Sequence, residues 1–138
     1  VEHLALVVRL LSRRGGRLTK SHRNDYAAAL RGLLRRGGDE ETIDRLMISA
    51  LIEARSCERF EILSRVATDD SLVKIYKALW ASEKGHYLSF IDLARQVAAL
   101  QGDDASAAVE DRWQKMLVAE RSIIMDQKPG PRMHSWPA

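Results

Sequence analysis

Apolar residues recur every three or four positions along most of the chain, the spacing that places them on one face of an α-helix. Glycines and capping residues separate five such stretches, which predict helices over residues 1–14, 22–36, 40–66, 71–100 and 105–126. We expect Asp39 to cap the third helix, and Asp103 or Asp104 to cap the last one. Residues 68–71 form a short connection between the two long helices, so these helices should pack as antiparallel neighbours. No stretch alternates with the period of a strand, and an all-α fold follows.

The two long helices each carry an apolar stripe that charged residues interrupt at its centre. The first stripe comprises Leu46, Ala50, Glu53, Cys57 and Phe60. The second comprises Tyr76, Leu79, Glu83, His86, Phe90 and Leu93. Glu53 and Glu83 each lie about 15 residues from the centre of the connection, or about 22 Å at the helical rise. Antiparallel packing should therefore bring the two carboxylates face to face inside the bundle.

Two facing carboxylates in an apolar interior repel each other and lose their hydration, so we expect a cation between them. Glu83 and His86, three residues apart, can point at one ion, and a Glu opposite a Glu-x-x-His forms half of a carboxylate-bridged di-iron site. Carboxylate oxygens with imidazole suit iron or manganese. His3 sits in the first helix where a further ligand would belong. The pattern alone also allows a metal-free Glu–His ion pair, or helix faces turned toward solvent.

Composition agrees with this picture. The chain has 138 residues, of which 46% are hydrophobic and only 6% aromatic, and this favours helices over strands. The length suits one domain, residues 1–126, followed by an extended proline-containing tail, residues 127–138. No apolar run reaches about 18 residues, so we expect no membrane span. Cys57 is the only cysteine and is expected to be a small core residue; without a disulfide or a signal peptide, we expect a cytoplasmic protein.

Positive charge is concentrated near the start of the chain. Residues 1–36 hold nine Lys and Arg against two acids, a net charge of +7, whereas residues 37–138 hold thirteen against seventeen, a net charge of −4. This basic segment is compatible with a solvated helix face or with a surface that binds phosphate. Its cations are Arg9, Arg13, Arg14, Arg17, Lys20, Arg23, Arg31, Arg35 and Arg36.

Two segments carry a family resemblance. Residues 52–60 read I-E-A-R-S-C-E-R-F, and residues 82–86 read S-E-K-G-H. They resemble the I-E-A-R-S-C-E-R-F and S-E-A-R-H motifs of the tRNA 2-methylthio-N6-isopentenyladenosine hydroxylase family. The resemblance covers roughly residues 1–100. It implies a ferritin-like four-helix bundle that here lacks its first helix and part of its second, with a crossover helix and a C-terminal helix.

The resemblance also implies a function. The family holds two iron ions and uses O2 to hydroxylate the isopentenyl group of a modified adenosine beside the tRNA anticodon, with electrons from a donor that the sequence does not identify. By resemblance, the metal ligands are His3, Glu53, Glu83 and His86. The residues expected around them are Arg55, Glu58, Arg59 and Tyr87, although ordinary salt bridges between helices explain the three charged ones equally well. The cations expected to contact tRNA are Arg13, Arg14, Arg17, Lys20, Arg23, Arg35 and Arg36.

The sequence departs from the family in two ways. Lys84-Gly85 replaces Ala-Arg in the second motif. The chain also starts at Val1 inside an uncapped helical pattern, and only two of four expected carboxylates are found. We therefore expect this chain alone to bind iron poorly, or to bind one ion, and to be inactive by itself. Two alternatives stay open: a ferritin-like oxidase of a small molecule, and a metal-free helical interaction domain. Glu120 is expected in a surface salt bridge.

Overall fold

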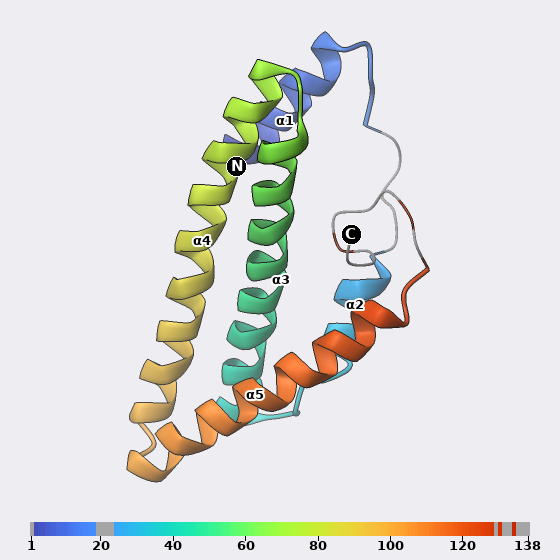
Figure 1. Cartoon of the computed structure of the whole chain (residues 1–138). Helices are drawn as coiled ribbons and strands as arrows, with labels where there is room; N and C mark the ends of the chain where they lie inside the picture. The colour runs from blue at the N-terminus through green and yellow to red at the C-terminus, as the bar shows by residue number, and fades with distance from the viewer. Residues whose placement is uncertain (1, 19–23, 129, 131–133, 135–138) are drawn as a thin grey trace.

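The computed structural model describes residues 2–18, 24–128, 130 and 134, with the backbone alone at residues 2 and 103–106. Its helices are α1 (Glu2–Arg13), α2 (Asp25–Arg31), α3 (Gly38–Val66), α4 (Asp70–Ala99) and α5 (Asp103–Met125), as Figure 1 shows. The described residues contain no strand, which agrees with the all-α prediction. Charged side chains recur along each described helix, and none offers the long apolar segment that a membrane span requires.

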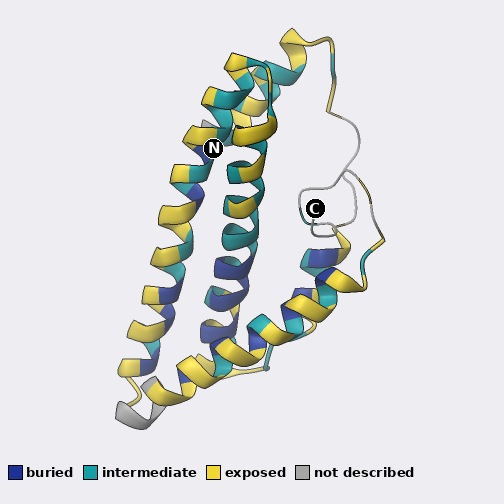
Figure 2. Ribbon diagram, in the orientation of Figure 1, coloured by how far each residue is buried: buried dark blue, intermediate teal, exposed yellow. Residues whose placement is uncertain are grey.

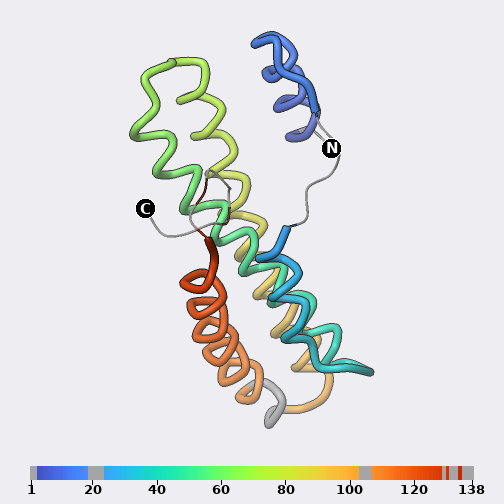
Figure 3. The backbone as a smooth tube through the Cα atoms, turned by 90° about the vertical axis from the view of Figure 1, so that its right-hand side faces the viewer, coloured from blue at the N-terminus to red at the C-terminus, as the bar shows by residue number. Residues whose placement is uncertain are grey.

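α3 and α4 form a long antiparallel hairpin, as their short connection predicts (Figure 1). The turn is fixed by Asp69, whose side chain accepts hydrogen bonds from the backbone N–H groups of Ser71 and Leu72 and so caps α4. Figures 1 and 3 agree that α1 lies beside the end of the hairpin that holds this turn, whereas α5 runs along the other half. The hairpin is therefore the frame on which the shorter helices pack.

The predicted and observed helix ends differ most at α2, at the start of α3 and at the start of α5. α3 begins one residue before Asp39, at Gly38, because Gly37 and Gly38 both adopt positive φ angles, 90° and 62°, that favour glycine. α5 likewise follows Gly102 rather than an aspartate cap. The predicted helix over residues 22–36 ends at Arg31, and the part of it over residues 22–23 lies outside the described residues.

A buried ion cluster explains the early end of α2. Asp44 is fully buried, and it accepts hydrogen bonds from both the backbone N–H (2.8 Å) and the guanidinium of Arg35. Arg112 on α5 donates to the same carboxylate at 2.8 Å and to the carbonyl oxygen of Leu33 at 2.6 Å. The chain after α2 therefore turns away from the helical path to reach Asp44. This cluster ties the α2–α3 loop, α3 and α5 together.

The hydrophobic core occupies one half of the hairpin. Its fully buried side chains come from four helices, α2 to α5, and include Tyr26, Leu30, Met47, Ala94 and Met116. In the half that holds the turn, no side chain of α3 beyond Leu51 is fully buried, and Ile62 and Val66 are exposed (Figure 2). The described part of the fold is thus tightly packed where α2 and α5 cover the hairpin and loosely packed near the turn.

Gly85 lies in the middle of α4, exposed and with open space where a Cβ would stand. We expect Gly85→Ala to increase the free energy of unfolding by about 0.5–1 kcal/mol, because alanine loses less backbone entropy on entering a helix. Urea unfolding followed by circular dichroism measures this change. Gly37→Ala is the matched control and should destabilise the chain, since its φ of 90° strains any side chain. Equal effects of the two substitutions would contradict the explanation.

Candidate metal centre

Glu53 on α3 and Glu83 and His86 on α4 converge at one place in the hairpin. Each contributes one candidate ligand atom, and these atoms lie within 4.8 Å of one another. Glu83 is buried and Glu53 is partly buried, whereas the side chain of His86 is 52% exposed. The equal distances from the turn therefore did predict which carboxylates meet across the hairpin.

Glu83 is the centre of the cluster. One of its oxygens, Oε2, lies 3.3 Å from Nδ1 of His86, and the other, Oε1, lies 3.5 Å from Nδ1 of His3 on α1. The two imidazole rings are 6.2 Å apart, centroid to centroid. The structure thus brings together all four residues that the sequence nominated as metal ligands, on three different helices.

The surroundings of Glu53 change its protonation. Burial raises the pKa of Glu53 to about 8, and a hydrogen bond and charge repulsion with Glu83 add to this effect. Near neutral pH the Glu53 carboxyl group therefore keeps its proton, which it donates in a hydrogen bond to Glu83. A cation bound between the two carboxylates would replace that proton and remove the repulsion between their charges.

The donor set tests whether iron fits here. Glu53, Glu83 and His86 offer two carboxylates and one imidazole, and His3 offers a second imidazole beside Glu83; these donors are of the kinds that Fe(II) and Mn(II) accept, and they carry two negative charges when ionised. This set suits one divalent ion. Within the part of the chain that the structure describes, no further carboxylate joins the group, so the cluster by itself does not balance the charge of two Fe(II) ions.

The residues expected around the ligands make other contacts. Arg55 reaches from α3 to α5, where its Nη2 lies 3.2 Å from Oε2 of Glu120, and it also pairs with Glu58 one turn away. The ring of Tyr87 lies against Trp113 of α5, with centroids 6.4 Å apart. Burial lowers the pKa of the His134 imidazole, and the nearby positive charges of Arg55 and Arg59 lower it further. These side chains connect the ligand helices to α5 and to the end of the chain.

A buried polar network near α5 was not predicted. The hydroxyl of Tyr26 donates to Glu120 at 2.6 Å, and burial together with this hydrogen bond raises the pKa of the phenol. The ring of His134 stacks on Tyr26 at 4.9 Å, and its Nε2 lies 3.2 Å from Oγ of Ser56. Glu120 does form the expected salt bridge, with Arg55, but it is only 3% exposed, so the expectation that this salt bridge lies at the surface was wrong.

The sequence did hold a signal for Glu120. It interrupts an apolar stripe on α5 formed with Trp113, Met116 and Ile124, all of which are buried. This is the same pattern of an acid within an apolar face that identified Glu53 and Glu83. Its partners lie 94 and 65 residues away in the sequence, so the pattern could not show what satisfies the charge.

The basic residues expected to contact tRNA divide into three groups. Lys20 and Arg23 lie outside the described residues. Arg14 and Arg35 form ion pairs within the fold, with Asp69 and with Asp44 and Glu40 respectively. The remaining three are exposed: Arg13, Arg17 and Arg36.

Known proteins resemble this chain over most of its length. A family model described as tRNA-(MS²IO⁶A)-hydroxylase (MiaE) matches residues 1–135. The tRNA 2-(methylsulfanyl)-N(6)-isopentenyladenosine(37) hydroxylase of Pseudomonas putida is 36% identical over 134 residues, which cover 96% of this chain and 62% of that protein. The protein of the same name from Salmonella typhimurium is 45% identical over 67 residues, 49% of this chain and 23% of the relative. The chain thus spans less than two thirds of the length of these relatives.

A solved structure shares the fold. It is described as protein 43 with aldehyde deformylating oxygenase activity from Synechococcus, and it matches with a TM-score of 0.84 and 28% identity over 98% of this chain and 66% of that chain. This likeness confirms the expected all-α, ferritin-like fold. The family match includes both motifs, around Glu53 and around Glu83, that carried the resemblance. The chain therefore belongs to the tRNA-(MS²IO⁶A)-hydroxylase (MiaE) family.

Proposed function

We propose that the protein hydroxylates the isopentenyl group of 2-methylthio-N6-isopentenyladenosine in tRNA, using O2 and a di-iron centre. The observation that carries this proposal is the convergence of Glu53, Glu83, His86 and His3 in a chain of this family. A tRNA substrate implies a protein that acts in the cytoplasm, close to the anticodon region of its substrate. The names of the two relatives support the same substrate.

The chain's own residues would hold the metal and shape its surroundings. Glu53 and Glu83 would bind iron through oxygen, and His3 and His86 through nitrogen, while further carboxylates outside this cluster would be needed for a second ion. Bound iron would supply the activation of O2 that no protein side chain provides. One oxygen atom enters the product and the other leaves as water, so two electrons and two protons must come from an external donor.

The substrate is tested by the nucleosides of cellular tRNA. We expect a strain that lacks the gene to lose the hydroxylated nucleoside and to accumulate its isopentenyl precursor, as measured by mass spectrometry. Complementation with the complete gene should restore the product, and complementation with a Glu83→Gln version should not. Hydroxylated nucleoside in the deletion strain would contradict the proposed substrate.

Metal affinity should depend on pH because Glu53 must lose its proton to bind a cation. With the pKa of Glu53 raised to about 8, we expect the affinity for Mn²⁺ to increase about fivefold between pH 7 and pH 8. Calorimetric titration at several pH values measures this slope. The raised pKa also means that the metal-free chain is most stable when Glu53 is protonated, so its stability should decrease as pH rises from about 4.5 through about 8.

Glu53→Gln is the control for this pH dependence. It should bind Mn²⁺ weakly and lose both the slope in affinity and the decrease in stability, because glutamine carries no titrating proton. If the Mn²⁺ affinity of the unsubstituted chain stays constant between pH 7 and pH 8, Glu53 does not hold a proton in this range.

A further inference from the structure

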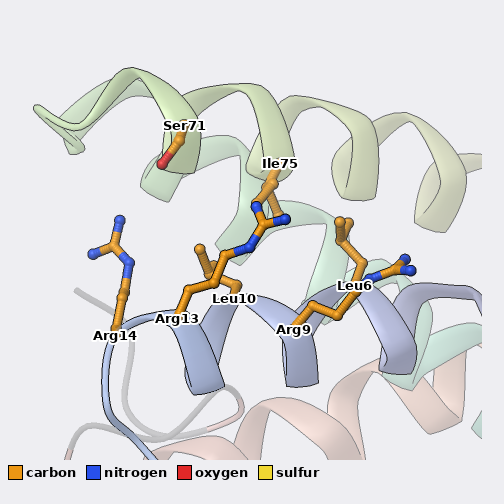
Figure 4. A pocket seen from close by; sticks show the side chains of 7 residues that line it. All are labelled: Leu6, Arg9, Leu10, Arg13, Arg14, Ser71 and Ile75. Atoms are coloured by element: carbon orange, nitrogen blue, oxygen red, sulfur yellow. The ribbon is translucent and has the colours of Figure 1, made fainter.

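A groove separates α1 from the first two turns of α4, with a cavity volume of about 490 Å³. Figure 4 shows Leu6, Leu10 and Arg13 projecting from α1 toward α4, and Ile75 projecting back from α4. Arg9, Arg14 and Ser71 complete its lining. The groove therefore combines an aliphatic floor with several guanidinium groups, a combination that suits a ligand with an apolar part and an anionic part.

Only part of the positive charge of the groove is neutralised by the residues that the structure describes. Asp69 pairs with Arg14 and also accepts a hydrogen bond from the hydroxyl of Ser71. Among the residues that the structure describes, neither Arg9 nor Arg13 has an ion-pair partner. Two guanidinium groups beside apolar side chains are thus left to bind an anion, and phosphate suits their geometry.

The groove lies on the same seam between α1 and α4 as the candidate metal centre. On α1, the spacing of His3, Leu6, Leu10 and Arg13 places them on one face, in order from the cluster outward. Leu6 is about one helical turn, or about 5 Å, from His3. On α4, Ile75 precedes Glu83 by about two turns on the same face, with the buried Leu79 between them. The apolar floor therefore runs from the arginines toward the carboxylate–imidazole cluster.

We propose that this groove binds the substrate nucleotide, with a phosphate of the anticodon loop on Arg9 and Arg13. The isopentenyl group lies over Leu6, Leu10 and Ile75 and points along the seam to the carboxylate–imidazole cluster. This assignment rests on the proposed function, because it takes a prenylated nucleotide of RNA as the ligand. It separates two tasks: the arginines bind any RNA backbone, and the aliphatic floor recognises the prenyl group.

Fluorescence anisotropy with two synthetic RNAs tests the two tasks. One RNA is an anticodon stem-loop that carries 2-methylthio-N6-isopentenyladenosine, and the other has plain adenosine at that position. We expect Arg9→Gln with Arg13→Gln to weaken the binding of both RNAs about ten- to hundredfold. The slope of log affinity against log salt should become shallower by about 0.7, because the one phosphate bound by the two arginines is no longer neutralised. The charge-matched control replaces the exposed Arg45 and Arg121 with glutamine, outside the groove.

The apolar floor has its own variant. Leu10→Ala with Ile75→Ala should reduce the preference for the prenylated RNA about tenfold and leave the affinity for the plain RNA unchanged. The matched control is Leu88→Ala with Leu93→Ala, two exposed leucines of α4 that do not line the groove. Circular dichroism verifies that each variant is folded, and a Mn²⁺ titration verifies that the cluster keeps its affinity.

Several outcomes would overturn the assignment. If RNA affinity falls equally in the Arg9→Gln, Arg13→Gln variant and in the charge-matched control, RNA binds to a diffuse basic surface and not to the groove. A prenyl preference that survives in the alanine variant, or dimerisation of the chain that this variant abolishes, would assign the aliphatic floor to another ligand or to a second copy. If the unsubstituted chain binds Mn²⁺ but neither RNA, the proposed function fails together with the groove. If RNA binding persists without Arg9 and Arg13, only the groove assignment fails.

Discussion

Replacement of Glu83 by glutamine is expected to reduce the affinity of this chain for Mn²⁺ or Fe²⁺ by at least about 100-fold. Glu83 is the one side chain that faces all three other candidate ligands, since its two oxygens approach His86 and His3 and it is hydrogen-bonded to Glu53. Glutamine keeps the shape but removes one negative charge and one oxygen donor. Titration with Mn²⁺, and with Fe²⁺ under anaerobic conditions, measures the decrease in affinity.

The same substitution should not destabilise the metal-free chain. Glu83 and Glu53 repel each other in a partly buried site, so the neutral variant should be at least as stable above pH 8 as the original chain. Loss of metal binding with unchanged or increased stability is typical of a residue kept for function rather than for folding. Glu58→Gln, an exposed acid of α3 that pairs with Arg55, is the control and should leave metal affinity unchanged. Unaltered affinity in Glu83→Gln would refute the metal centre.

Asp44→Ala is expected to have the opposite effect, with a decrease of about 3–5 kcal/mol in the free energy of unfolding. Asp44 is fully buried between Arg35 and Arg112, and its removal leaves two guanidinium groups without their shared carboxylate. Burial alone would raise the pKa of Asp44, but hydrogen bonds from Arg112 and Arg35 outweigh it and lower the pKa. The stability from this cluster is therefore present above about pH 4 and lost as pH falls through the lowered pKa.

Urea unfolding measures the effect of Asp44→Ala. The expected decrease is a large part of the free energy of unfolding of a typical domain, roughly 5–15 kcal/mol. Glu40→Ala is the matched control. Glu40 is 61% exposed and, among the described residues, forms an ion pair only with Arg35, so its removal should cost less than about 1 kcal/mol. Similar decreases in the free energy of unfolding for the two substitutions would mean that the burial of Asp44 does not increase its contribution to stability. Variants that remain folded should bind Mn²⁺ as the original chain does.

The sequence predicted the carboxylate–imidazole cluster because its signal is local to each helix. Glu53 and Glu83 interrupt apolar stripes at equal distances from a short connection. The helical period and the antiparallel packing therefore place the two side chains opposite each other. The helix bounds near Asp44 were predicted less well. There the path of the chain depends on Arg112, 68 residues away in the sequence, and no local pattern carries that information.

The buried network at Glu120 shows the same limit. Its position within an apolar stripe was visible, but the charge is satisfied by Tyr26 and Arg55 on two other helices. Propensity and spacing describe one helix at a time, whereas a buried charge is stabilised by whatever the tertiary fold brings to it. The participation of His134 is beyond prediction for the same reason, since its contacts with Tyr26 and Ser56 depend on the tertiary fold.

The uneven burial along the α3–α4 hairpin has a consequence for how the molecule opens. Segments with few buried apolar side chains unfold locally at lower free energy than the core does. The end of the hairpin that holds the turn is such a segment, and the carboxylate–imidazole cluster lies between it and the packed half. A bound cation that joins α1, α3 and α4 would therefore stabilise the part of the hairpin that unfolds locally at the lowest free energy. Bound iron would therefore raise the free energy of local unfolding of the ligand helices more than the free energy of global unfolding of the domain.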